Sequence, residues 1–184
     1  MSTVAGDEHQ SRRRAGPAPV TEDYMLPVAA YSLALALIGT TGAGPCDLVD
    51  RAAATQLLGV PPASVTPSGP EPDEDTGGTR TTCVYMAGQR MLVVIRVAYA
   101  SAAAAREATT QEMQAEKLAE DDATAKEVSG PGDKAFLVHT KYGVQYVVLK
   151  GSSVISLALG GMPNPLPTYE AQLRTAAGAA ATKL

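Results

Sequence analysis

The sequence predicts an α+β fold, in which a mainly antiparallel sheet of about five strands carries helices packed on it. Short runs rich in β-branched residues occur in two groups, a pair followed by a set of three, and short Gly-containing turns separate the members of each group. Segments with helical periodicity precede, separate and follow the two groups. Because strands joined by short turns must run antiparallel, we expect the order helix-β-β-helix-β-β-β-helix in one sheet.

Composition limits the classes of protein that this chain can belong to. Its 184 residues are 45% hydrophobic but only 4% aromatic, with no Trp. A chain of this length is typical of one domain, and its core must come from Val, Leu, Ile and Ala. The net charge of −4 argues against a nucleic-acid partner, which would require a basic surface. Nothing in the sequence predicts a cofactor.

The N-terminal part of the chain is typical of an export segment. Polar residues 1–23 include three arginines, residues 25–39 are apolar (MLPVAAYSLALALIG), and residues 40–44 are small. This order is that of a secretory signal peptide, and the apolar run is shorter than the roughly 20 residues of a membrane-spanning helix. We therefore expect residues 1–44 to be a polar N-terminus with a signal peptide or membrane anchor, and residues 45–184 to be one extracytoplasmic domain. Membrane contact is expected only through residues 25–39, if they are not cleaved, and a buried core helix is the alternative for them.

The chain has two cysteines, Cys46 and Cys83. They are too few for a closed structural zinc site, which needs four ligands, so no metal site is predicted. In an oxidising compartment they would form a disulfide tying the opening helix to the first strand. Two free buried thiols are the alternative.

The first part of the domain contains one helix and one polar segment. Asp50 is a suitable N-cap for a helix over residues 51–58, and Gly59 is a suitable C-terminal stop. Residues 61–79 are rich in Pro, Gly, Ser and acids, which predicts a flexible surface loop. Its run Asp73-Glu74-Asp75 lacks the ligand spacing of a calcium loop, so we interpret it as a solvated acidic loop.

The remaining elements follow from periodicity and turn residues. Strands are predicted over residues 80–86 and 90–98, and a helix is predicted from Ser101 to about residue 120. An acidic and Gly-rich connection over 121–133 leads to the last elements, which are strands at 134–140, 144–150 and 154–159 and a helix beginning with Thr168 as its cap.

Several short motifs together resemble a known family. They are Pro-Cys-Asp-Leu-Val at 45–49 with Leu-Leu-Gly closing the helix, Cys83-Val84-Tyr85, the turn Gly-Pro-Gly-Asp-Lys-Ala-Phe at 130–136, and Lys150-Gly151. In order and spacing, residues 45–160 resemble an actinobacterial family of exported lipoproteins of unknown function. The resemblance implies an envelope location, a Cys46–Cys83 bridge and an α+β fold, and it carries over no catalytic residue. The chain lacks the separate upstream lipidation cysteine of that family.

The sequence contains no catalytic constellation, so we do not predict an enzyme. Ser152 is not in a Gly-x-Ser-x-Gly elbow, and His139 has no partner recognisable in the sequence. The leading interpretation is an exported, non-catalytic binding or interaction domain whose partner is an envelope protein. A carrier of a small apolar ligand is the alternative, and a hydrolase of envelope material is a third. Aromatic side chains could line an interface or a ligand pocket, and the candidates are Tyr85, Tyr99, Tyr142, Tyr146 and Tyr169.

Overall fold

The computed structural model describes residues 44–119, 124–162 and 167–184, with the side chains of 116–119 and 167 excepted. The predicted export segment, including its apolar run at 25–39, therefore lies outside the described residues except for Gly44. Within the part of the chain that is described, no helix is both long enough and apolar enough to span a membrane.

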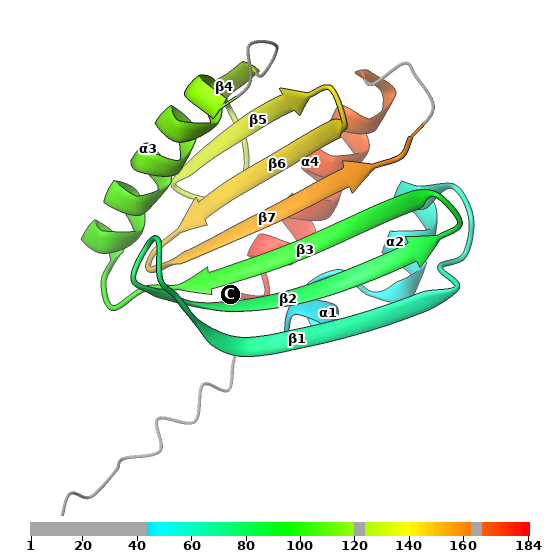
Figure 1. The fold of residues 1–184 in the computed structure, drawn as a ribbon, viewed down its shortest axis with the longest axis horizontal. Coiled ribbons are helices and arrows are strands. Elements are labelled where there is room, and N and C mark those ends of the chain that lie inside the picture. The colour runs from blue at the N-terminus through cyan, green and yellow to red at the C-terminus, as the bar shows by residue number, and fades with distance from the viewer. Residues whose placement is uncertain (1–43, 120–123, 163–166) are drawn as a thin grey trace, which may run out of the picture. The chain divides into compact units, whose positions relative to one another are not determined.

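The domain is built on a seven-stranded sheet in which every neighbouring pair is antiparallel (Figure 1). The spatial order is β1-β2-β3-β7-β6-β5-β4, so the first hairpin joins the later strands through β3 and β7. The α+β class is confirmed. The strands are β1 (Ser64–Asp73), β2 (Gly78–Ala87), β3 (Arg90–Ala98), β4 (Thr124–Val128), β5 (Lys134–Thr140), β6 (Gly143–Lys150) and β7 (Ser153–Gly160).

The expected count of five strands was wrong, because both edge strands were interpreted as loops. β1 lies inside the predicted loop 61–79, and β4 lies inside the predicted connection 121–133. An edge strand bonds to one neighbour only, so it tolerates proline and needs no alternating apolar residues. β1 pairs with β2 over nearly its whole length although almost all of its residues are exposed, and its register shifts between Ser68 and Glu71. Hydrophobic periodicity therefore could not reveal either edge.

Helices cover both faces of the sheet. The short α1 (Pro45–Leu48), α2 (Arg51–Leu58) and α4 (Pro167–Ala181) pack on one face, and α3 (Ala102–Ala119) packs on the other. The predicted caps are confirmed for two helices, since Asp50 Oδ1 accepts from the Ala53 amide at 2.8 Å and Ser101 Oγ accepts from the Ala104 amide at 3.1 Å. α4 begins one residue before the predicted cap Thr168.

The alternation along each strand gives two apolar cores. The larger core lies between the sheet and α1, α2 and α4, and it is built on Leu92, Val94, Ile155 and Leu157, none of which exposes any surface (0%). The smaller core lies between the sheet and α3, and it includes Val147 with the buried face of that helix. Leu48, Ala54, Leu57 and Leu58 of α1 and α2 are all buried in the larger core.

Cations from distant parts of the chain satisfy the carbonyl ends of three helices. Lys183 Nζ donates to the carbonyl oxygen of Asp47 at 2.6 Å, at the end of α1. Arg90 Nη1 donates to Leu58 O at 2.6 Å in α2, and Lys150 Nζ donates to Ala181 O at 2.7 Å in α4. The last carbonyls of a helix lack intrahelical partners and attract positive charge, so these contacts join each helix end to the sheet or the C-terminus.

Candidate functional site

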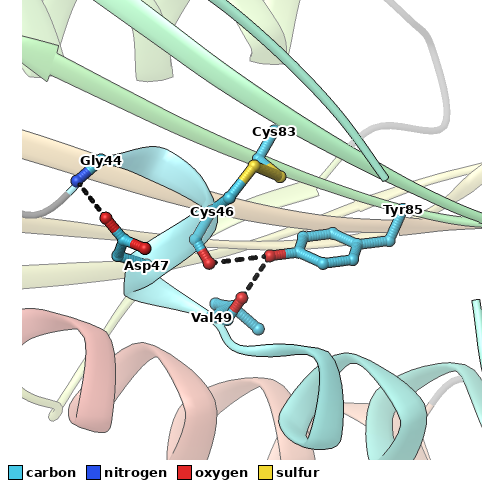
Figure 2. Close-up of a disulfide and its surroundings, with 6 residues drawn as sticks. All are labelled: Gly44, Cys46, Asp47, Val49, Cys83 and Tyr85. Atoms are coloured by element: carbon cyan, nitrogen blue, oxygen red, sulfur yellow. Dashed lines mark hydrogen bonds between the residues drawn. A yellow bond between two sulfur atoms is a disulfide. The ribbon is translucent and has the colours of Figure 1, made fainter. Parts of the chain in front are cut away.

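A disulfide anchors the start of the domain to the sheet, as the sequence predicted. Cys46 in α1 and Cys83 in β2 are bonded, with their Cα atoms 5.2 Å apart (Figure 2). The bridge joins positions 37 residues apart. Cys83 is fully buried in the larger core, so the bond fixes α1 over the sheet rather than forming an exposed redox pair.

Tyr85 completes this anchor from the same face of β2. Its hydroxyl donates to the carbonyl oxygen of Val49 and lies 3.1 Å from that of Cys46 (Figure 2). Burial raises the pKa of Tyr85 above its ordinary value, and the nearby carboxylates of Asp50 and Asp47 raise it further. The side chain is 1% exposed, so Tyr85 holds α1 in place and is not available to a ligand.

A cavity of about 360 Å³ between α3 and the sheet has the composition of a small-molecule site. Its apolar lining residues are Ile95 and Val97 from β3, Val154 from β7, and Ala108 and Ala115 from α3, and the carboxylate side chains of Asp75 and Glu112 also line it. We call it the α3 cavity. Its size is within the several hundred cubic ångströms that ligand pockets occupy, and such pockets combine apolar walls with a few placed polar groups.

The polar end of the α3 cavity is formed by an ion pair on the first hairpin. Arg80 donates to the carboxylate of Asp73 through Nε at 2.9 Å and through Nη2 at 2.7 Å. The Asp73 side chain is 2% exposed and that of Arg80 is 40% exposed. Asp73 also accepts from the Thr76 amide at 3.3 Å. The prediction of a solvated acidic loop was therefore wrong for Asp73, although Glu74 and Asp75 are exposed.

Tyr99 lines the same cavity next to this pair. Burial raises the pKa of Tyr99, and the neighbouring hydroxyl of Thr76 offsets part of that rise. Gln111 and Ser156 add further polar groups to the lining, and Ser156 Oγ is held by the side-chain amide of Gln145 at 2.8 Å. The cavity can therefore offer a ligand an apolar surface and several hydrogen-bonding groups, with a guanidinium at one end.

The five tyrosines named from the sequence do not share one site. Tyr85 belongs to the disulfide anchor, Tyr99 lines the α3 cavity, and Tyr146 lines a second cavity on the opposite face of the sheet. Tyr169 packs partly buried against the larger core. Tyr142 is 70% exposed in the β5–β6 turn, with Lys141 Nζ 4.8 Å from its ring centre.

Sequence reasoning also missed the partner of His139. Its Nε2 atom lies 3.1 Å from Oε1 of Glu170 in α4. The two residues belong to different elements, so no spacing in the sequence could have revealed the contact. Asp73 and Arg80 had a weak signal, since an acid and a base flank the Gly77-Gly78 pair, but in the hairpin Asp73 lies opposite Gly78 and Arg80 opposite Glu71, so the pair is diagonal.

Comparisons with known proteins identify the fold. No family model and no curated protein matches the sequence. Among solved structures, the chain is similar to the extracellular domain of PknH from Mycobacterium tuberculosis, with a TM-score of 0.52 and 12% sequence identity over 79% of this chain and 100% of that one. This likeness concerns the fold.

Proposed function

We propose that residues 45–184 form an extracytoplasmic, non-catalytic binding domain whose ligand site is the α3 cavity. The bridge between Cys46 and Cys83 supports the compartment, because structural disulfides persist in oxidising environments. The similarity to an extracellular domain is compatible with it. Membership of the exported actinobacterial family, with its envelope location, is part of the same proposal.

The main support for the ligand site is the ion pair between the buried carboxylate of Asp73 and the part-exposed Arg80, at one end of the α3 cavity. The carboxylate of Asp73 is nearly inaccessible, whereas the Arg80 side chain is 40% exposed and keeps donors available. Ile95, Val97 and Val154 supply an apolar surface next to it. The best match is a small amphipathic molecule, with its apolar part on the strands and an acceptor group facing Arg80.

Methyl NMR tests the site directly, because the chain contains only three isoleucines, Ile38, Ile95 and Ile155. Ile95 lines the α3 cavity, whereas Ile155 is fully buried in the other core. The protein recovered from the exporting cell is labelled at the isoleucine δ1 methyl groups and titrated with 1-anilinonaphthalene-8-sulfonate, an aromatic anion. We expect the Ile95 signal to shift with saturation and the Ile155 signal to stay in place.

A filled cavity provides the matched control. Ala115→Trp places an indole in the lining, whereas Ala103→Trp places the same group on an exposed position of the same helix, outside the cavity. Binding should be lost in the first variant and retained in the second. Equal binding by both variants would refute the assignment of the site. A full-length mass with two alkylatable thiols in the native protein would separately refute the compartment.

A further inference from the structure

A second cavity, on the opposite face of the sheet from the α3 cavity, contains a buried hydroxyl that has no partner among the described residues. Tyr146 in β6 is 2% exposed, and its hydroxyl makes no hydrogen bond to the described residues. The cavity has a volume of about 410 Å³ and lies between α4 and strands β4 to β6. We call it the Tyr146 cavity.

The surroundings hold this hydroxyl in place without satisfying it. A Cβ atom added to Gly130 would lie 2.4 Å from the Tyr146 hydroxyl oxygen, so the phenol packs against backbone that bears no side chain. An unpaired buried hydroxyl is destabilising because it gives up its hydrogen bonds to water without replacing them. Such a group in a native protein needs an explanation, and a ligand that accepts its hydrogen bond on binding is one. The Tyr146 hydroxyl is therefore a candidate ligand contact.

Arg174 places a positive charge on the same cavity. It lines the wall one helical turn after Glu170 on α4, an arrangement in which the two side chains could pair. Glu170 instead contacts His139 at 3.1 Å, and no described carboxylate lies within ion-pair distance of the Arg174 guanidinium. The guanidinium lowers the pKa of Tyr146 against the larger rise that burial causes.

The other lining groups define the rest of the ligand. Val128, Leu137 and Ala171 give an apolar wall, and Thr175 Oγ1 already donates to Ala171 O at 3.0 Å. The hydroxyl and the guanidinium are both donors, so the cavity offers an anion two hydrogen-bonding groups next to an apolar surface. Glu170 is also in the lining, and its charge disfavours a dianion such as a phosphate monoester.

We propose that the Tyr146 cavity binds a small amphipathic carboxylate, which accepts hydrogen bonds from the Tyr146 hydroxyl and the Arg174 guanidinium and lays its apolar part on Val128 and Leu137. This site is separate from the α3 cavity, since the sheet lies between the two. Charge-assisted hydrogen bonds are about twice as strong as neutral ones, so the carboxylate should account for most of the selectivity.

The test uses the protein recovered from the exporting cell, with ¹³C-labelled tyrosine rings and isoleucine δ1 methyl groups, and three probes with the same alkyl chain: octanoate, octanol and octyl phosphate. The chain has seven tyrosines, and the spectrum of Tyr146→Phe assigns the Tyr146 signal. We expect octanoate to shift the Tyr146 signal and to bind about tenfold or more tightly than octanol, as loss of a charged hydrogen bond predicts. Octyl phosphate should bind no more tightly than octanoate.

Two variants and two controls locate the contacts. Tyr146→Phe and Arg174→Gln should each lower the affinity for octanoate about tenfold. Tyr169→Phe removes a hydroxyl from α4, the helix that carries Arg174, at a position outside the cavity lining. Arg106→Gln removes an exposed arginine from α3. Both variants should bind octanoate as the wild type does.

Stability gives a readout that is independent of the probe. Because the Tyr146 hydroxyl has no partner in the part of the chain that the structure describes, Tyr146→Phe should melt at or above the wild-type temperature in the absence of ligand. A lower melting temperature would show that the hydroxyl is satisfied and would overturn the proposal. It would also be overturned by equal affinity for octanoate and octanol, by tighter binding of octyl phosphate, or by octanoate shifting Ile95 rather than Tyr146. The last result would assign the ligand to the α3 cavity and leave the proposed function standing.

Discussion

Arg80 holds the buried carboxylate of Asp73 through two nitrogen atoms, at 2.9 and 2.7 Å, across the turn that joins β1 to β2. The pair closes the polar end of the α3 cavity and also fixes the edge hairpin. One contact therefore connects the stability of an exposed, proline-containing edge strand with the shape of the proposed ligand site.

Removing the Arg80 cation should destabilise the fold, because the carboxylate of Asp73 stays buried. Arg80→Met leaves Asp73 buried without its charged partner and should lower the free energy of unfolding by about 1–3 kcal/mol, less than for a wholly buried pair because Arg80 is partly solvated. Urea denaturation measures the change. The control Lys134→Met breaks a pair with Glu127 in which both side chains are about half exposed, and it should cost under about 0.5 kcal/mol. Equal effects would contradict the structural role of the buried pair.

The disulfide should contribute a large part of the stability. Its 37-residue separation corresponds to about 4 kcal/mol of loop-closure entropy in the unfolded chain. The double variant Cys46→Ala/Cys83→Ala should lose up to that amount in guanidinium denaturation. Adding reductant should lower the stability of the wild type toward the same value and leave the variant unchanged. If the double variant matched the oxidised wild type, the bridge would not stabilise the domain.

Gly130 and Tyr146 should show coupled effects. Gly130→Ala puts a methyl group 2.4 Å from the Tyr146 hydroxyl oxygen and 2.9 Å from the Ala135 Cβ atom, and overpacking of this kind costs about 1–3 kcal/mol. Combining it with Tyr146→Phe removes the closer clash and should recover part of the loss, as a double-mutant cycle measures.

A second glycine provides the control for this substitution. Gly178 lies in α4, where an added Cβ atom would meet only Pro131 atoms at 3.8 and 3.9 Å. Gly178→Ala should therefore raise stability by about 0.5–1 kcal/mol through helix propensity. A loss at Gly178 similar to that at Gly130 would mean that the effect is not caused by the Tyr146 contact.

Stability should fall in alkaline solution because of three buried tyrosines. Tyr85, Tyr99 and Tyr146 have pKa values raised by burial in the folded state. The unfolded chain releases these phenolic protons from about pH 10 upward, whereas the folded protein retains them to higher pH. Their contribution is therefore complete below pH about 10 and is lost as pH rises through the folded values.

Tyrosinate absorbance near 295 nm, followed together with circular dichroism, checks this prediction. Tyr85, Tyr99 and Tyr146 should ionise together with unfolding. In Tyr85→Phe the dependence of stability on pH above about 10 should be shallower than in the wild type. The variant should also be less stable at neutral pH, because it lacks the hydrogen bond to Val49. Ionisation of all tyrosines before unfolding would contradict the buried positions.

Local patterns were enough for the elements that pack against a core. Each of these signals lies within a short stretch of sequence, because capping and alternation act over one helical turn or one strand. Examples are the helix caps at Asp50 and Ser101, the helix stop at Gly59, and the strands of the two hairpin groups. The two cysteines and the export-like N-terminus likewise led to the bridge that the structure contains.

Tertiary contacts decided the edges of the sheet and both cavities. β1 and β4 are strands because a neighbour with unpaired backbone groups lies beside them, and their own residues carry little apolar signal. The buried Asp73 is paired with Arg80, and Glu170 contacts His139 while no carboxylate among the described residues pairs with Arg174. Burial and pairing of a charged group depend on which distant side chain arrives next to it, and only the folded arrangement of the strands and α4 determines that.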